Sequence, residues 1–134
     1  MSEKILKLVL LVTGVACATA VIPMLMPLSW MVATHERLGL GPAPQGPIFE
    51  YLARTVSALY AILGGLMILT VTDLPRYRPV IAFIGACFLA LGVFVSVLTR
   101  LIGLPWWWTC GEGGDTIAFG IAVLLLLRFS PQRH

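Results

Sequence analysis

The chain has 134 residues, of which 59% are hydrophobic and 11% are charged, and its mean hydropathy is +0.96. Soluble proteins average about 25% charged residues, so this composition excludes an ordinary soluble domain and indicates an integral membrane protein. The net charge of +3 comes from residues that flank apolar segments. No cluster of Lys and Arg with interleaved aromatic residues indicates a nucleic-acid partner.

The N-terminal segment is an apolar run that follows Lys4 and Lys7. Its length predicts a first span over about residues 5–27. Pro23 and Pro27 each lack a backbone N–H and so cannot donate to the carbonyl four residues earlier. We therefore expect this helix to kink toward its end.

A less apolar stretch over about residues 29–38 separates the first two spans. Ser29 is a suitable N-cap, and Gly39 can close a helix in the left-handed conformation. The stretch therefore predicts a short helix that lies along the membrane interface. A loop rich in proline and glycine follows it.

Two further spans are predicted over about residues 47–71 and 79–103, each beginning at a proline. A tight polar turn separates them. Small residues recur every four positions along both segments, which predicts close packing of neighbouring helices on these stripes. The stripes are Ala53, Ser57, Ala61 and Gly65 in one helix and Ala82, Ala86 and Ala90 in the other.

The last span contains two carboxylates, Glu112 and Asp115, among three glycines. If the helix began only after Asp115, its apolar part would be about 12 residues, well short of the roughly 20 needed to cross a bilayer. Started at Pro105, it is long enough. We therefore predict a fourth span over about residues 105–129, with both acids inside it.

The distribution of basic residues predicts the orientation. Lys4, Lys7, Arg76, Arg78, Arg128 and Arg133 fall on one side of a four-span chain, against Arg37, Arg54 and Arg100 on the other. The majority side is expected to be cytoplasmic, so we predict a multi-pass membrane protein with both termini in the cytoplasm.

Arg54 and Glu112 lie at similar predicted depths. Each is about 10 Å into its span when counted from Pro47 and Pro105. A guanidinium and a carboxylate at one level are expected to pair, because either alone is costly in hydrocarbon. We predict an outer polar cluster of Arg54, Glu112, Asp115, Arg100, Glu50 and His35, covered by Trp30, Trp106, Trp107 and Trp108.

Three roles for this cluster stay open from sequence alone. The first role is an ion-pair network that fixes the order of the helices. The second is a pocket for a lipid, quinone or other amphipathic ligand. The third is a site where Glu112 or Asp115 acts as acid or base. No G-x-S-x-G, H-E-x-x-H or P-loop motif is present. No catalytic residue is therefore named, an enzyme is disfavoured, and we expect neither a metal nor a cofactor.

Several short motifs recur together in a group of small bacterial membrane proteins. They are His35 with Leu38-Gly39-Leu40-Gly41, Pro47-Ile48, Glu50-Tyr51-Leu52-Ala53-Arg54, Ser57-Ala58-Leu59-Tyr60, Arg76-Tyr77-Arg78-Pro79, Gly103-Leu104-Pro105 with Trp108, and Glu112-Gly113. From about Pro27 to Leu127 the chain resembles this group of four-helix integral membrane proteins, whose function is not established. More distantly, it resembles DoxX-like four-helix proteins. The resemblance implies a four-helix fold in the bacterial inner membrane and carries no activity.

The sequence therefore predicts an all-α fold, a single integral membrane domain over residues 1–134. We expect a bundle of four transmembrane helices with a short interfacial helix between the first two spans. The expected function is non-catalytic: binding of a lipid-like or quinone-like amphipathic ligand, or service as an accessory subunit of a membrane complex. The alternative is a membrane enzyme or proton-handling component. The expected partners are the bilayer, such a ligand, and a second copy or larger complex.

Overall fold

The computed structural model describes residues 2–44 and 46–130. Two predictions involve residues outside this range. One is the location of the two chain ends, and the other is the inclusion of Arg133 in the charge count. All regular secondary structure in the described residues is helical, which confirms the all-α prediction. Four stretches of the described chain are long and apolar enough to cross a membrane: Ser2–Leu25, Pro47–Thr72, Arg78–Leu101 and Trp106–Arg128.

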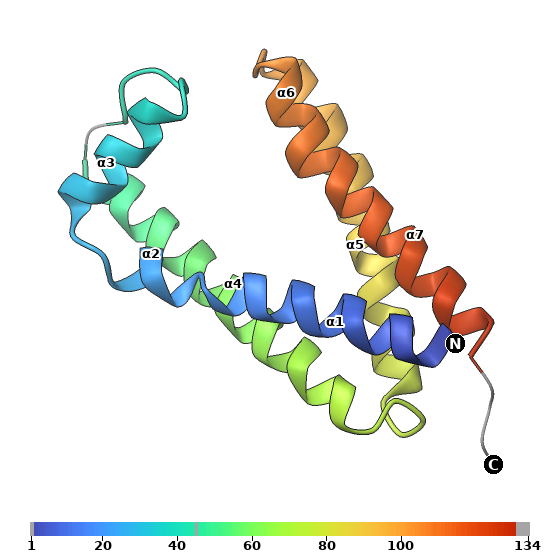
Figure 1. Cartoon of the computed structure of the whole chain (residues 1–134). Helices are drawn as coiled ribbons and strands as arrows, with labels where there is room; N and C mark the ends of the chain where they lie inside the picture. Colours follow the sequence, from blue (N-terminus) through green and yellow to red (C-terminus); the bar gives the residue numbers. More distant parts are fainter. Residues whose placement is uncertain (1, 45, 131–134) are drawn as a thin grey trace. The chain divides into compact units, whose positions relative to one another are not determined.

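The chain divides into two units. Figure 1 shows the whole chain coloured by residue number. Unit 1 comprises Met1–Leu11 and Leu69–His134, and unit 2 comprises Val12–Ile68. The helices α1 (Ser2–Ala18) and α4 (Pro47–Thr72) contribute residues to both units.

Unit 1 is built around an antiparallel helical hairpin (Figure 1). Its first arm is α5 (Arg78–Leu101), and its second arm is the continuous helical run of α6 (Trp106–Trp108), η1 (Thr109–Gly114) and α7 (Asp115–Arg128). Gly103, with φ +76°, lies in the left-handed region and closes α5. Its N–H bonds the Arg100 carbonyl at 3.3 Å, and the next N–H bonds Thr99 O at 2.9 Å, as in a Schellman motif.

Glycines bring the two arms of the hairpin into close contact. Gly85 and Gly92 on α5 are seven residues apart, as are Gly113 and Gly120 on the opposite arm. A Cβ at Gly92 would lie 2.7 Å from Ile117 N and 3.0 Å from the Gly113 carbonyl oxygen. Because side chains at seven-residue spacing stay on one face of a gently crossing helix pair, these glycines form a continuous contact surface.

An apolar core lies at the end of the hairpin farthest from the Gly103 turn. There the start of α1 packs beside the end of α7. Ser2 Oγ donates a hydrogen bond to the Phe129 carbonyl at 3.0 Å. The buried residues of this core come from α1, the turn before α5, α5 and α7: Leu6, Leu10, Leu74, Ile81, Val123 and Leu127.

In unit 2 the first apolar stretch is interrupted, as its prolines predict. The helix α1 ends at Ala18, and α2 (Val21–Leu25) follows after a two-residue turn. Pro23 has no N–H to give to the Thr19 carbonyl, which instead accepts from Ile22 N at 2.9 Å. The chain then becomes extended at Met26, before Pro27 leads into the next helix.

The helix α3 (Leu28–Arg37) occupies the stretch predicted to be helical over about 29–38. Gly39 follows it with φ +72°, and its N–H bonds the Glu36 carbonyl at 3.0 Å, which confirms Gly39 as the closing residue. The location of α3 at a membrane interface stays a prediction.

The contact between α1 and α4 in unit 2 depends on Gly64. A Cβ there would collide with the backbone of Ala18 and would lie 2.5 Å from the Gly14 carbonyl oxygen, whereas one at Gly65 would meet nothing within 4 Å. The packing residue is therefore Gly64, one position away from the predicted stripe. In α5, likewise, Ala86 and Ala90 are exposed and the packed positions are glycines.

We predict that Gly64→Ala destabilises the protein by about 1–3 kcal/mol, because the added methyl meets backbone that cannot move aside. The neighbouring Gly65→Ala is the matched control and should leave stability unchanged or raise it, since alanine favours the helix. Unfolding in mixed detergent micelles measures both. Equal effects of the two substitutions would contradict the α1–α4 contact.

Candidate functional site

Arg54 lies two turns into α4 and has three hydrogen bonds within unit 2. Its Nε and Nη2 donate to Glu50 Oε1 at 2.9 and 2.7 Å, and the latter is also a salt bridge. Its Nη1 donates to the Met24 carbonyl at 2.7 Å. The four-residue spacing on one helix face explains the pair with Glu50, whereas sequence reasoning did not identify the Met24 carbonyl as a partner.

The Met24 carbonyl is available because α2 ends one residue later, at Leu25. The last carbonyls of a helix have no intrahelical donor and carry the negative end of the helix dipole. A guanidinium is a favourable partner for such a carbonyl. Pro23 and Pro27 indicate free carbonyls in this segment, because a proline has no N–H to donate to a preceding carbonyl.

His35 holds the loop between α3 and α4. Its Nδ1 lies 3.3 Å from the Gly41 carbonyl oxygen, a hydrogen bond that requires the proton on Nδ1. Its ring meets Phe49 edge-on, with centroids 6.0 Å apart. In the described part of unit 2 these contacts tie His35 to the loop and to the start of α4, and none joins it to Arg54.

Glu112 and Asp115 lie within a continuous helical run that begins at Trp106 and qualifies as a candidate membrane span. This agrees with a fourth span that starts at Pro105. Both side chains are exposed, as is that of Arg100 near the end of α5. Among the described residues of unit 1, none of these three charged groups makes an ion pair. Glu112 and Arg54 belong to different units, and their pairing stays a prediction.

The acidic segment has a helical geometry that the sequence did not reveal. Thr109–Gly114 forms a π-helix, with α-helix on both sides. π-helical turns are rare and are often found at functional sites. Gly111 and Gly114 have nothing within 4 Å of an added Cβ, so bare backbone is accessible beside Glu112. The Glu112 carbonyl accepts a hydrogen bond from Thr116 Oγ1.

The opposite side of the π-helix is locked against α5. A Cβ at Gly113 would overlap the Ser96 hydroxyl, so only glycine fits. Thr109 is 6% exposed, and its hydroxyl is the buried side-chain oxygen without a hydrogen-bond partner among the described residues. Gly113 therefore faces α5 and Thr109 is buried, while Glu112 and Asp115 are exposed.

The tryptophans that were predicted to cover the cluster are largely exposed. Trp106, Trp107 and Trp30 are 78%, 42% and 65% exposed. Trp107 packs edge-on against Trp108, with centroids 5.7 Å apart. Exposed tryptophans at the end of a span are typical of membrane-interface anchors, and their role as a cover stays a prediction.

No group of three or more His, Cys, Asp or Glu side chains in the described residues is arranged to hold a metal ion. Comparison of the chain with protein-family models, with curated proteins and with solved structures gives no match. The resemblance to small bacterial four-helix proteins therefore stays a prediction, and the function must be argued from the site itself.

The orphaned hydroxyl gives a test of the π-helical packing. Thr109→Val keeps the shape and removes an unsatisfied buried group, so it should raise the free energy of unfolding by about 1 kcal/mol. Thr99→Val is the control, because the Thr99 hydroxyl donates to the Val95 carbonyl at 2.8 Å and its loss should cost about 1 kcal/mol. Destabilisation by both substitutions, measured by detergent unfolding, would show that the Thr109 hydroxyl has a partner.

Proposed function

We propose that the chain is a non-catalytic, multi-pass protein of the bacterial inner membrane that binds a partner through its acidic π-helical segment. The partner is a lipid-like or quinone-like amphipathic ligand, or a neighbouring subunit of a membrane complex. The observation that supports this proposal most directly is that Glu112 and Asp115 are exposed and unpaired within the hairpin of a candidate span.

Unpaired charges in hydrocarbon are expensive, so such groups in membrane proteins face a partner or a hydrated cavity. The α5 arm does not supply that partner, because it packs against the opposite side of the π-helix. The partner must therefore come from outside the hairpin. The bare backbone at Gly111 and Gly114 favours binding here, because a group without steric hindrance from a Cβ can approach closely.

Arg54 contributes to this function in a different way. Its guanidinium already bonds Glu50 and the Met24 carbonyl, so a ligand at Arg54 would compete with two protein partners. Arg54 is 33% exposed at its side chain, which leaves room for one further acceptor. We infer that Arg54 is primarily a structural clamp within unit 2.

A double-mutant cycle tests the predicted Arg54–Glu112 pair. Arg54→Leu should cost about 2 kcal/mol through its lost charged hydrogen bonds. If the pair forms, combining it with Glu112→Gln should cost less than the sum of the single changes, with a coupling of about 0.5–3 kcal/mol. Glu50→Gln in place of Glu112→Gln is the positive control, because that pair is observed. Additive effects of Arg54→Leu and Glu112→Gln would rule out the contact.

Native mass spectrometry tests binding by the acidic segment. The chain released from mild detergent should retain a lipid, a quinone-like molecule or a second protein, and Glu112→Gln with Asp115→Asn should release it. Asp73→Asn, which removes a carboxylate from the turn before α5, is the matched control and should retain the bound species. Identical spectra for all three proteins would argue against this site.

The alternative function is proton handling by the same carboxylates, which the π-helix also favours because such turns are often functional. It predicts proton movement across proteoliposomes that contain the purified chain, and its loss in Glu112→Gln. If these proteoliposomes are no more permeable to protons than protein-free liposomes, the proton-handling function is ruled out and the binding function stands.

A further inference from the structure

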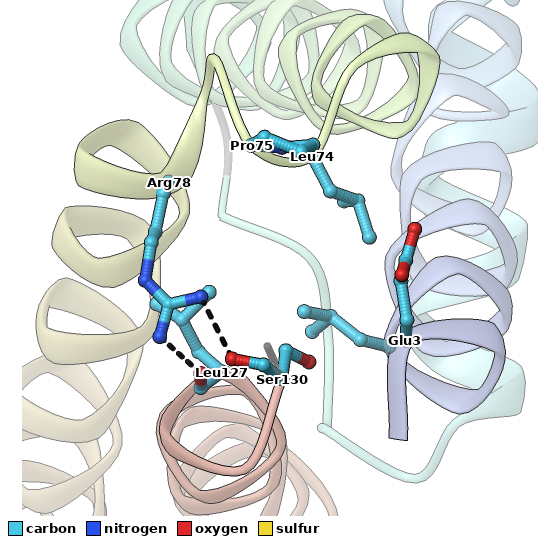
Figure 2. A pocket seen from close by; sticks show the side chains of 7 residues that line it. Glu3, Leu74, Pro75, Arg78, Leu127 and Ser130 are labelled. Atoms are coloured by element: carbon cyan, nitrogen blue, oxygen red, sulfur yellow. Dashed lines mark hydrogen bonds between the residues drawn. The ribbon is translucent and has the colours of Figure 1, made fainter. Parts of the chain in front are cut away.

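A second charged region lies at the opposite end of the unit 1 hairpin. The ends of three helices meet there: Ser2 in α1 bonds the Phe129 carbonyl at the end of α7, and Arg78 at the start of α5 bonds the carbonyls of Leu127 and Ser130 at 2.6 and 3.3 Å. Glu3, Leu74 and Ser130 also line one small hollow of about 20 Å³. Figure 2 shows Arg78 and Glu3 on opposite sides of this hollow.

We call this region the basic end, and it is defined by the cations that it gathers: Lys4, Lys7, Arg76, Arg78 and Arg128. All of them except the half-buried Arg78 are exposed. The two ends of the hairpin therefore differ in charge, since the far end carries Arg100, Glu112 in the π-helix and Asp115 at the start of α7.

The basic end also contains two acids, Asp73 and Glu3. Asp73 Oδ1 accepts a hydrogen bond from the Arg76 backbone N–H at 3.2 Å and so closes the turn before α5. Glu3 lines the hollow beside Leu6 and Leu74. Five cations against two acids leave these helix ends with a net positive charge.

The location of these cations identifies their partner. They lie at the ends of candidate membrane spans, where the phosphate groups of a bilayer are found, and lysine and arginine stems extend along apolar surface to reach that layer. Basic groups between helix ends are typical sites for anionic headgroups, and each contributes about 1 kcal/mol near an anionic surface. We propose that the basic end binds the phosphate headgroup of an anionic phospholipid.

This site is independent of the acidic segment, because it uses none of its residues. Arg78 has a structural part in it, since two of its N–H groups already cap the end of α7. The exposed residues Lys4, Lys7 and Arg76 have no protein hydrogen bond from their side chains among the described residues, although Arg76 lies over the Tyr77 ring. These three are therefore the side chains to change.

The test measures the thermal midpoint of the full chain in a neutral detergent with added phosphatidylglycerol, with phosphatidylcholine of the same acyl chains, or with inorganic phosphate. Phosphatidylglycerol should raise the midpoint more than phosphatidylcholine does, and phosphate alone should not reproduce the shift. Equal shifts for the two lipids, or a full shift with inorganic phosphate, would overturn the proposal.

The variants are Lys4→Gln, Lys7→Gln and Arg76→Gln together, against a charge-conserving control with Lys4→Arg, Lys7→Arg and Arg76→Lys. Each cation is worth about fivefold in affinity, so the neutral triple variant should bind phosphatidylglycerol at least about tenfold more weakly, while the control binds normally. If the neutral triple does not fold, Lys7→Gln alone should lose about fivefold. Unchanged affinity in the folded neutral variant would overturn the proposal.

Discussion

The close contact between α5 and the π-helical arm is the constraint on which the rest of unit 1 depends. Gly92 and Gly113 bring the two backbones together, and no larger side chain fits at either position. Once Gly113 faces Ser96, the chain geometry turns Glu112 and Asp115 away from α5. Packing that contains no charged group therefore determines where the charged groups point, and so which surface is available to a partner.

Arginines satisfy helix-end carbonyls in both units. Arg54 bonds the Met24 carbonyl at the end of α2, and Arg78 bonds two carbonyls at the end of α7. Backbone groups in or near hydrocarbon need internal partners, because water is scarce there. Each arginine thus donates to backbone carbonyls that would otherwise lack a hydrogen-bond partner. An arginine inside a candidate span is therefore not by itself evidence of a ligand.

Much of the architecture could be predicted from local features. The apolar lengths identified four helical stretches, Pro47 and Pro105 marked two helix starts, and Pro23 and Gly39 marked an interruption and a helix end. Each of these depends on a residue's own backbone chemistry or on neighbours a few positions away. Such effects can be read without knowing which helices pack together.

The π-helix and the glycine contacts could not be predicted in this way. Small residues at four-residue spacing, such as Ala82, Ala86 and Ala90, drift around a helix and two of these three are exposed. Glycines at seven-residue spacing, which stay on one face of a helix pair, form the contact instead. The glycines of one arm meet those of the other, and the π-helix adds a residue that allows this contact. Both features depend on which helix packs against which, and a single segment of sequence does not reveal that.

The central claim is that the acidic segment is part of a membrane-crossing helix, and the exposed free thiol of Cys110 permits a direct measurement. A nitroxide attached to Cys110, with Cys17 and Cys87 replaced by alanine, can be compared in liposomes with one at Pro42→Cys in the α3–α4 loop. The account predicts that the Cys110 label collides more often with lipid-soluble oxygen than with a water-soluble nickel chelate, and that the loop label shows the reverse. Equal access of the chelate to both labels would contradict it.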